Sequence, residues 1–195
     1  MISQIKLSTI IATGFGIGFI KKAPGTFGSI LAFPLYFLFT YLLIVVKGGV
    51  ASLASLDLIN SMLVLITLLF FIGIWASECY CNENKKYDPK EIVIDEVVGQ
   101  MLNIALVMLF LPYIGEAVIS KFKDYGIDAL KLVIINLFAS FVLFRLFDIT
   151  KPWPIKTIEA SYKNGFGVMI DDICAAVLRC IMQFFILFAI IDQLK

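Results

Sequence analysis

Acidic and basic side chains occur in short clusters that long apolar segments separate. Asp95-Glu96 and Asp171-Asp172 are adjacent acidic pairs, and Arg145 stands three residues before Asp148. Branched apolar residues flank Asp95-Glu96 on both sides, so at least one of these carboxylates must enter an apolar core. A buried carboxylate needs a positive partner, which either a metal ion or a basic side chain supplies. These clusters are therefore the first candidates for chemistry.

The types of donor atom favour a magnesium site that handles phosphate. The sequence has no histidine, and its four cysteines show no CxxC spacing, which argues against zinc. Carboxylate oxygens are hard ligands that suit Mg²⁺. Such an ion neutralises phosphoryl oxygens and readies a water for in-line attack. The lack of histidine also excludes phosphatases that form a phosphohistidine intermediate.

A second phosphate-binding feature precedes the first long apolar segment. In Lys21-Lys22-Ala23-Pro24-Gly25-Thr26, proline and glycine predict a turn and the lysines add positive charge. The following helix would offer free backbone N–H groups to an anion. The same residues also suit an ordinary helix start, so this feature gains weight only beside the carboxylates.

The charged clusters also have simpler interpretations, which the sequence leaves open. Arg145 and Asp148 share a helix face and could neutralise only each other. Asp171-Asp172 could be a pair at a helix N-terminus, where carboxylates are stabilised. Adjacent residues lie about 100° apart around a helix, so these two aspartates cannot both face one point.

The elements that position these residues are expected to be membrane helices. Apolar residues make up 61% of the 195 residues and charged residues only 16%, against about 45–50% and about 25% in soluble domains. A hydrocarbon core needs about 20 residues. We therefore predict an all-α fold: a single domain over residues 1–195, built as a compact polytopic membrane bundle of about five apolar helices. Those segments are Phe27–Val46, Leu56–Ala76, Ile92–Leu111, Leu130–Phe147 and Val168–Ile191, with Ile5–Ile20 as a short interfacial or re-entrant helix.

The distribution of lysines predicts how the bundle is oriented. Basic residues are concentrated at the N-terminus and in the loops around Lys85 and Lys151, so the positive-inside rule assigns these parts to the cytoplasm. The loop that carries Asp124 mixes both charges and weakens this assignment. All four charged clusters then lie at the cytoplasmic face. The net charge of +1 gives no reason to expect nucleic acid as a partner.

Taken together and in order, these motifs resemble the phosphatidylglycerophosphatase A family. The resemblance rests on Gly14–Gly18, Pro24–Ser29, Ile94–Gly99, Phe144–Ile155 and Gly165–Asp172, so it covers most of the chain. It implies Mg²⁺-dependent hydrolysis of phosphatidylglycerophosphate, an anionic phospholipid, to phosphatidylglycerol and phosphate in phospholipid biosynthesis. It also implies a compact all-α fold in the bacterial inner membrane. Where family members often have Ala-Gly after the paired aspartates, this chain has Ile173–Ala176.

We assign roles to the candidate residues as a hypothesis. The metal ligands would be Glu96, Asp148, Asp171 and Asp172, with Asp95 as a ligand or general base. The lipid phosphate would be held by Lys22, Thr26 and Arg145, with Lys151 as a weaker candidate. A metal-activated water and a phosphoaspartate intermediate are both consistent with these residues.

Two other classes of function compete with the phosphatase. Carboxylates in membrane helices also line the paths of small cation or proton carriers, although here they gather at one face and no inverted repeat is evident. The chain could also be a lipid-binding subunit without turnover. The sequence does not determine the oligomeric state.

Overall fold

The computed structural model describes residues 6–48, 55–110, 126 and 128–193, and within them the chain is helical with no strand. The all-α prediction is thus confirmed. Five long helices carry the fold, with three short elements beside them. The short elements are α1 (Leu7–Ala12), the 3-10 helix η1 (Ile17–Phe19) and α7 (Ile155–Ser161). The long helices are α2 (Pro24–Val46), α3 (Ser55–Asn84), α4 (Ile94–Phe110), α6 (Ala129–Thr150) and α8 (Gly165–Gln193).

Local sequence signals account for several of the helix ends. Proline occupies the first turn of α2, where its missing N–H has no partner to lose. The Asp128 carboxylate caps α6 by accepting a hydrogen bond of 2.8 Å from the backbone N–H of Lys131. At its other end, α6 stops at Lys151, which has a φ of 41° and precedes Pro152.

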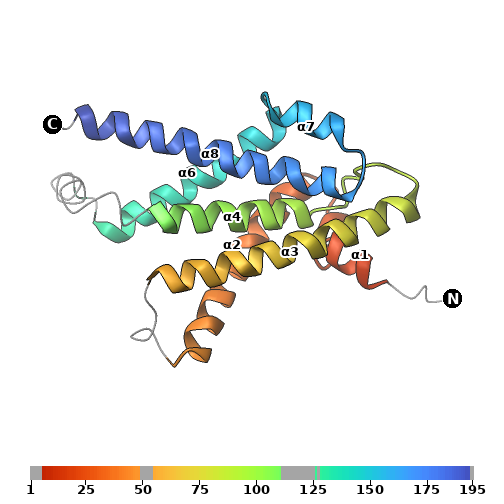
Figure 1. The fold of residues 1–195 in the computed structure, drawn as a ribbon, viewed down its shortest axis with the longest axis horizontal. Coiled ribbons are helices and arrows are strands. Elements are labelled where there is room, and N and C mark those ends of the chain that lie inside the picture. The colour runs from red at the N-terminus through yellow and green to blue at the C-terminus, as the bar shows by residue number, and fades with distance from the viewer. Residues whose placement is uncertain (1–5, 49–54, 111–125, 127, 194–195) are drawn as a thin grey trace.

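Helix α4 is the centre of the bundle. It packs against α2, α3, α6 and α8, and α8 also contacts α3, α6 and α7. Figure 1 shows α4 running between α3 and α8, with α1 and α7 at the same end of the molecule. Val98, Met101 and Ile104 of α4 are fully buried, and so are its polar residues Gln100 and Asn103. The buried surface therefore covers most of the circumference of this helix, as expected at the core of a bundle.

Three of the described helices are long and apolar enough to cross a membrane: Pro24–Val46, Asp57–Asn84 and Leu130–Thr150. Their outer faces expose large apolar side chains, such as Tyr41, Val64 and Phe138, and lipid is the solvent that suits such faces. Five spanning segments were expected. Helices α4 and α8 occupy the positions of the other two, but α4 has 17 residues within the described part of the chain and α8 carries Asp171, Asp172 and Arg179 within its length.

Some predicted boundaries differ from those observed. The Ile5–Ile20 segment is described from Lys6, and it forms α1, packed against α3, and η1. Helix α8 begins at Gly165 rather than Val168, and α7 occupies a stretch that the sequence analysis treated as a loop. Residues 111–125, which include Asp124 and most of the mixed-charge loop, lie outside the described residues.

Candidate active site

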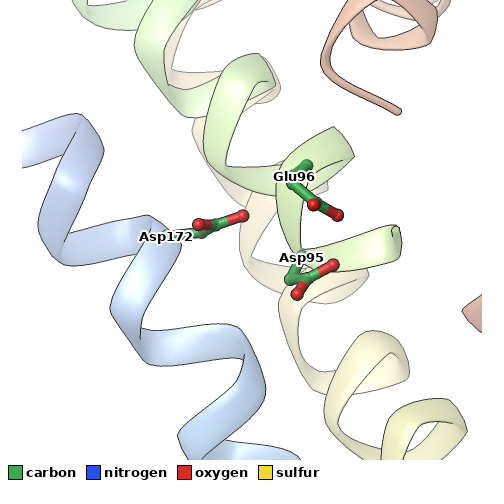
Figure 2. A group of neighbouring side chains, drawn as sticks. All are labelled: Asp95, Glu96 and Asp172. Atoms are coloured by element: carbon green, nitrogen blue, oxygen red, sulfur yellow. The ribbon is translucent and has the colours of Figure 1, made fainter. Parts of the chain in front are cut away.

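Three carboxylates from two helices meet at one end of the bundle. Asp95 and Glu96 lie in the first turn of α4, and Asp172 lies in the second turn of α8. Each offers an oxygen atom, and these atoms lie within 4.8 Å of one another. Figure 2 shows Asp172 projecting from α8 towards the two acidic residues of α4. Asp95 and Asp172 expose only 9% and 2% of their surface, so the carboxylate triad is buried.

The carboxylate triad contains oxygen atoms without hydrogen-bond partners. Asp95 Oδ1, Glu96 Oε2 and Asp172 Oδ2 are all buried, and none has a partner among the described residues. Buried carboxylates that face one another repel unless a cation lies between them or protons neutralise them. Three hard oxygen donors around one point are the donor set of a divalent cation such as Mg²⁺. The residues present therefore fit a hard metal ion.

Arg145 borders the triad from α6. Its guanidinium donates to Asp148 Oδ2 at 2.6 Å, lies 3.8 Å from Glu96 Oε1, and donates to Ser29 Oγ at 3.4 Å. The Arg145 side chain is 14% exposed, and its Nε has no partner among the described residues. The guanidinium thus keeps a donor free beside a carboxylate cluster. Asp148, predicted as a metal ligand, instead lies against this cation.

Lys151 holds a second pair of acidic residues. Its ammonium group lies 2.7 Å from Asp171 Oδ2 and 2.7 Å from Glu159 Oε1. The left-handed backbone at Lys151 ends α6 and carries the chain into the segment that leads to α7. Although burial alone would lower the pKa of Lys151, the Asp171 and Glu159 carboxylates raise it above its ordinary value. Lys151 is therefore a fixed positive charge between α7 and α8.

The first turn of α2 lies directly on the triad. A Cβ built at Gly25 would lie 1.9 Å from Glu96 Oε1 and 3.1 Å from the Arg145 guanidinium. On α4, a Cβ at Gly99 would lie 3.0 Å from the Cβ of Asp172 and 2.9 Å from the Phe144 ring. Glycine at both positions lets the four helices α2, α4, α6 and α8 approach closely enough for their charged groups to meet.

The predicted site residues thus fall into three groups. Asp95, Glu96 and Asp172 form the triad, while Asp148 pairs with Arg145 and Asp171 with Lys151. Lys22 is exposed at the start of α2 and Thr26 is half-buried. Neither the Lys22 ammonium group nor the Thr26 hydroxyl has a partner within the described part of the chain. The catalytic and binding roles of these residues remain predictions.

One sequence interpretation of α8 needs correction. Asp171 and Asp172 are not at its N-terminus, because the helix begins six residues earlier at Gly165. The glycines before them serve packing: a Cβ at Gly165 would meet the Ile74 carbonyl of α3 at 2.3 Å, and one at Gly167 would meet the Tyr162 carbonyl at 1.9 Å. These glycines therefore bring backbones together, and no ligand is needed to explain them.

Sequence reasoning also missed two residues that line the site. Glu159 was passed over because the segment before α8 was read as a loop, whereas α7 brings its carboxylate to Lys151. Ser29 was expected only as part of the Pro24–Ser29 motif, and its hydroxyl accepts from Arg145.

The chain was compared with known proteins. The family model described as phosphatidylglycerophosphatase A matches residues 10–187. The chain belongs to this family. The match contains every charged residue of the site, from Lys22 to Asp172.

Curated relatives agree with this family. The chain is 31% identical to phosphatidylglycerophosphatase A of Haemophilus influenzae, over 94% of this chain and 90% of that protein. It is 29% identical to phosphatidylglycerophosphatase A of Escherichia coli, over 94% of this chain and 87% of that protein. It is also 32% identical to a putative phosphatidylinositol-3-phosphatase of Bacteroides thetaiotaomicron, over 90% of this chain and 91% of that protein. No solved structure matches the chain.

Proposed function

We propose that this protein hydrolyses the terminal phosphate monoester of phosphatidylglycerophosphate. The observation that carries the proposal is the triad of Asp95, Glu96 and Asp172. One oxygen atom of each carboxylate is buried without a partner among the described residues, and Arg145 lies beside the triad. Hard oxygen donors next to a buried guanidinium suit a phosphoryl group held by a metal ion. The names of the Haemophilus influenzae and Escherichia coli relatives support this substrate.

The triad would hold Mg²⁺, with Asp95, Glu96 and Asp172 as ligands from two helices. A bound Mg²⁺ would neutralise phosphoryl oxygens and lower the pKa of a bound water. This assignment replaces Asp148 and Asp171, from the ligand set suggested by sequence, with Asp95. The reason is geometric, since Asp148 and Asp171 are already engaged by Arg145 at 2.6 Å and by Lys151 at 2.7 Å.

The side chains around the triad would bind and orient the phosphate. Arg145 has a free Nε and lies 3.8 Å from Glu96, so it can bind a phosphoryl oxygen without leaving its carboxylate partners. Lys22 and Thr26, at the start of α2, would add a mobile charge and a hydroxyl above Gly25. Lys151 would not contact the phosphate. It would hold α8 against α7 through its ion pairs with Asp171 and Glu159.

The attacking group would be a water held at the triad. A carboxylate of the triad would take its proton, since Asp95 Oδ1, Glu96 Oε2 and Asp172 Oδ2 are all buried without a partner among the described residues. Trapping ³²P on the protein from labelled substrate would instead indicate an aspartyl phosphate. The products would be phosphatidylglycerol and inorganic phosphate, which assigns the enzyme to phospholipid biosynthesis.

The lysine distribution supports a location in the bacterial inner membrane with the triad on the cytoplasmic side. The ends of α2, α4, α6 and α8 that carry the charged clusters lie at the end of the bundle that holds α1 and α7. The substrate would therefore be a lipid of the cytoplasmic leaflet, with its head group at the membrane interface.

The test is phosphate release from phosphatidylglycerophosphate by purified protein in detergent, with Mg²⁺ and with EDTA. Wild-type protein should release phosphate only with Mg²⁺, and Asp172→Asn should release none at the Mg²⁺ concentration that suffices for the wild type, while still folded. Asp57→Asn, an exposed aspartate in the first turn of α3, is the matched control and should remain active. No release by folded wild-type protein would contradict the proposal.

A second substrate is favoured by one comparison. The Bacteroides thetaiotaomicron relative is a putative phosphatidylinositol-3-phosphatase and is as similar to this chain as the other two. Both lipids present a phosphate monoester on a diacylglycerol-linked head group, so the same assay should include phosphatidylinositol 3-phosphate. Cation flux in liposomes tests the carrier alternative, and lipid binding without phosphate release would indicate a non-catalytic subunit.

A further inference from the structure

An apolar groove lies between α2 and α6 on the membrane-facing side of the molecule. Its volume is about 360 Å³ and its walls are almost entirely apolar. Phe33 and Phe141 meet across it with ring centroids 6.1 Å apart. Ile30, Ile134 and Phe138 remain 48–69% exposed along it. The lining residues are Ile30, Phe33, Ile134, Leu137, Phe138 and Phe141.

The groove is aligned with the candidate site. Ile134, Phe138 and Phe141 stand eleven, seven and four residues before Arg145 on α6. At about 100° per residue these positions lie within about 40° of Arg145 around the helix. On α2, Ile30 and Phe33 follow Ser29, which accepts a hydrogen bond from Arg145. The groove therefore leads directly to the guanidinium that borders the carboxylate triad.

The distance from the deep end of the groove to Arg145 matches one membrane leaflet. Ile134 lies about 16 Å below Arg145 at a rise of about 1.5 Å per residue, and half of a hydrocarbon core is about 15 Å. We infer that this groove binds an acyl chain of the lipid monoester substrate and so brings its phosphate to Arg145 and the triad. The inference rests on the proposed function and adds the route by which the lipid enters, sideways from the cytoplasmic leaflet.

Other apolar clefts are aligned less well with the triad. A cleft between α3 and α8 includes Ile173, but Ile173 is about 100° around α8 from Asp172 and so faces away from the carboxylates. A cleft beneath α1 is lined by Leu31 and Leu35 of α2, which lie on a different face of α2 from Phe33. Of these three clefts, the groove between α2 and α6 is the one with a cationic side chain in line with its apolar wall.

Matched substitutions on α6 test the groove. Ile134→Trp fills its deep end, whereas Ile135→Trp adds the same bulk to the next residue, which is outside the groove and similarly exposed at 49% against 56%. Hydrolysis is measured with phosphatidylglycerophosphate carrying eighteen-carbon or six-carbon acyl chains. Ile134→Trp should raise KM for the long-chain lipid about tenfold, the equivalent of losing roughly two buried methylenes. Ile134→Trp should leave KM for the short-chain lipid unchanged, and Ile135→Trp should leave KM for both lipids unchanged.

The pattern of failure separates the two proposals. Wild-type protein that hydrolyses neither lipid would overturn the proposed function and the groove assignment with it. The groove assignment alone would be overturned if wild-type protein hydrolyses both lipids and Ile134→Trp changes KM no more than Ile135→Trp does. It would also be overturned if Ile134→Trp raises KM equally for both chain lengths.

A second measurement needs no variant. Substrate with a diazirine midway along one acyl chain is irradiated with wild-type protein, and the labelled peptides are mapped. We expect label at residues 30–33 and 134–141, removed by excess unlabelled substrate but not by phosphatidylcholine. Label confined to the cleft between α3 and α8, or removed equally by phosphatidylcholine, would overturn the inference.

Discussion

Gly25 and the Glu96 carboxylate touch without room for a methyl group: a Cβ at Gly25 would lie 1.9 Å from Glu96 Oε1. The close atom is the end of the Glu96 side chain, so a methyl group at position 25 would displace this carboxylate within the triad. Glu96 in turn lies 3.8 Å from Arg145, so the position of Gly25 influences the proposed metal ligands and the proposed phosphate-binding cation together.

Gly25→Ala should therefore lower turnover by about 100-fold, because displacing a catalytic group by about 1 Å has effects of that size. Phosphate release and thermal unfolding in the same detergent measure activity and folding separately. Gly48→Ala is the control, since nothing lies within 4 Å of a Cβ there. Its positive φ of 84° predicts a stability loss of about 1 kcal/mol and normal turnover. Full activity in Gly25→Ala would contradict the close contact.

The two adjacent aspartates of α8 should respond differently to removal of charge. Asp172 belongs to the triad, so Asp172→Asn should raise the Mg²⁺ concentration needed for activity by about 100-fold or more. Asp171 instead pairs with Lys151, so Asp171→Asn should raise that concentration by only about tenfold, the low end of the effect expected for a residue that supports the ligands. Mn²⁺ binding followed by electron paramagnetic resonance gives the affinities directly. The reverse order would return Asp171 to the ligand set that sequence suggested.

Arg145 and Asp148 should behave as one unit. Arg145→Lys keeps the charge but loses the planar fork that contacts Asp148, Glu96 and Ser29, so KM for the lipid should rise about tenfold. If Asp148 acts only through Arg145, adding Asp148→Asn to Arg145→Lys should change KM little further. A double-mutant cycle on KM and on Mg²⁺ affinity decides this. Additive losses in both quantities would indicate that Asp148 binds the metal itself.

The sequence sufficed to predict that charged clusters gather at one end of the bundle. That inference needed only the alternation of apolar helices and short charged loops, because helix direction reverses at each loop. It also predicted that Arg145 and Asp148 share a face, since three residues nearly complete a helical turn. The helical periodicity of one segment determines such local relationships.

Contacts between helices could not be predicted from the sequence. Whether Asp171 or Asp172 faces α4 depends on the rotation of α8, which Gly165 and Gly167 set by packing against α3 and Tyr162. The pairing of Lys151 with Glu159 depends on α7, seven residues long with no side-chain cap to announce it. The role of Gly25 depends on how closely α2 approaches α4. Each of these is decided by packing at distant positions.

The last prediction concerns Arg179, which is only 1% exposed within α8. Its guanidinium donates to the Asn103 carbonyl at 2.7 Å and to Gln183, whose side chain donates to Asn136 at 2.7 Å. No carboxylate among the described residues pairs with Arg179. Its positive charge is therefore stabilised by hydrogen bonds to neutral groups of α4 and α8, and Asn136 of α6 extends this network.

Arg179→Ala should lower the free energy of unfolding by about 3 kcal/mol, because it leaves a cavity and a buried carbonyl without its donor. Arg179→Met keeps most of the volume and removes the charge, so it should cost less than the alanine variant. Thermal unfolding of both variants in one detergent compares them. A methionine variant as unstable as the alanine variant would show that the polar network, rather than the filled volume, holds α8 against α4.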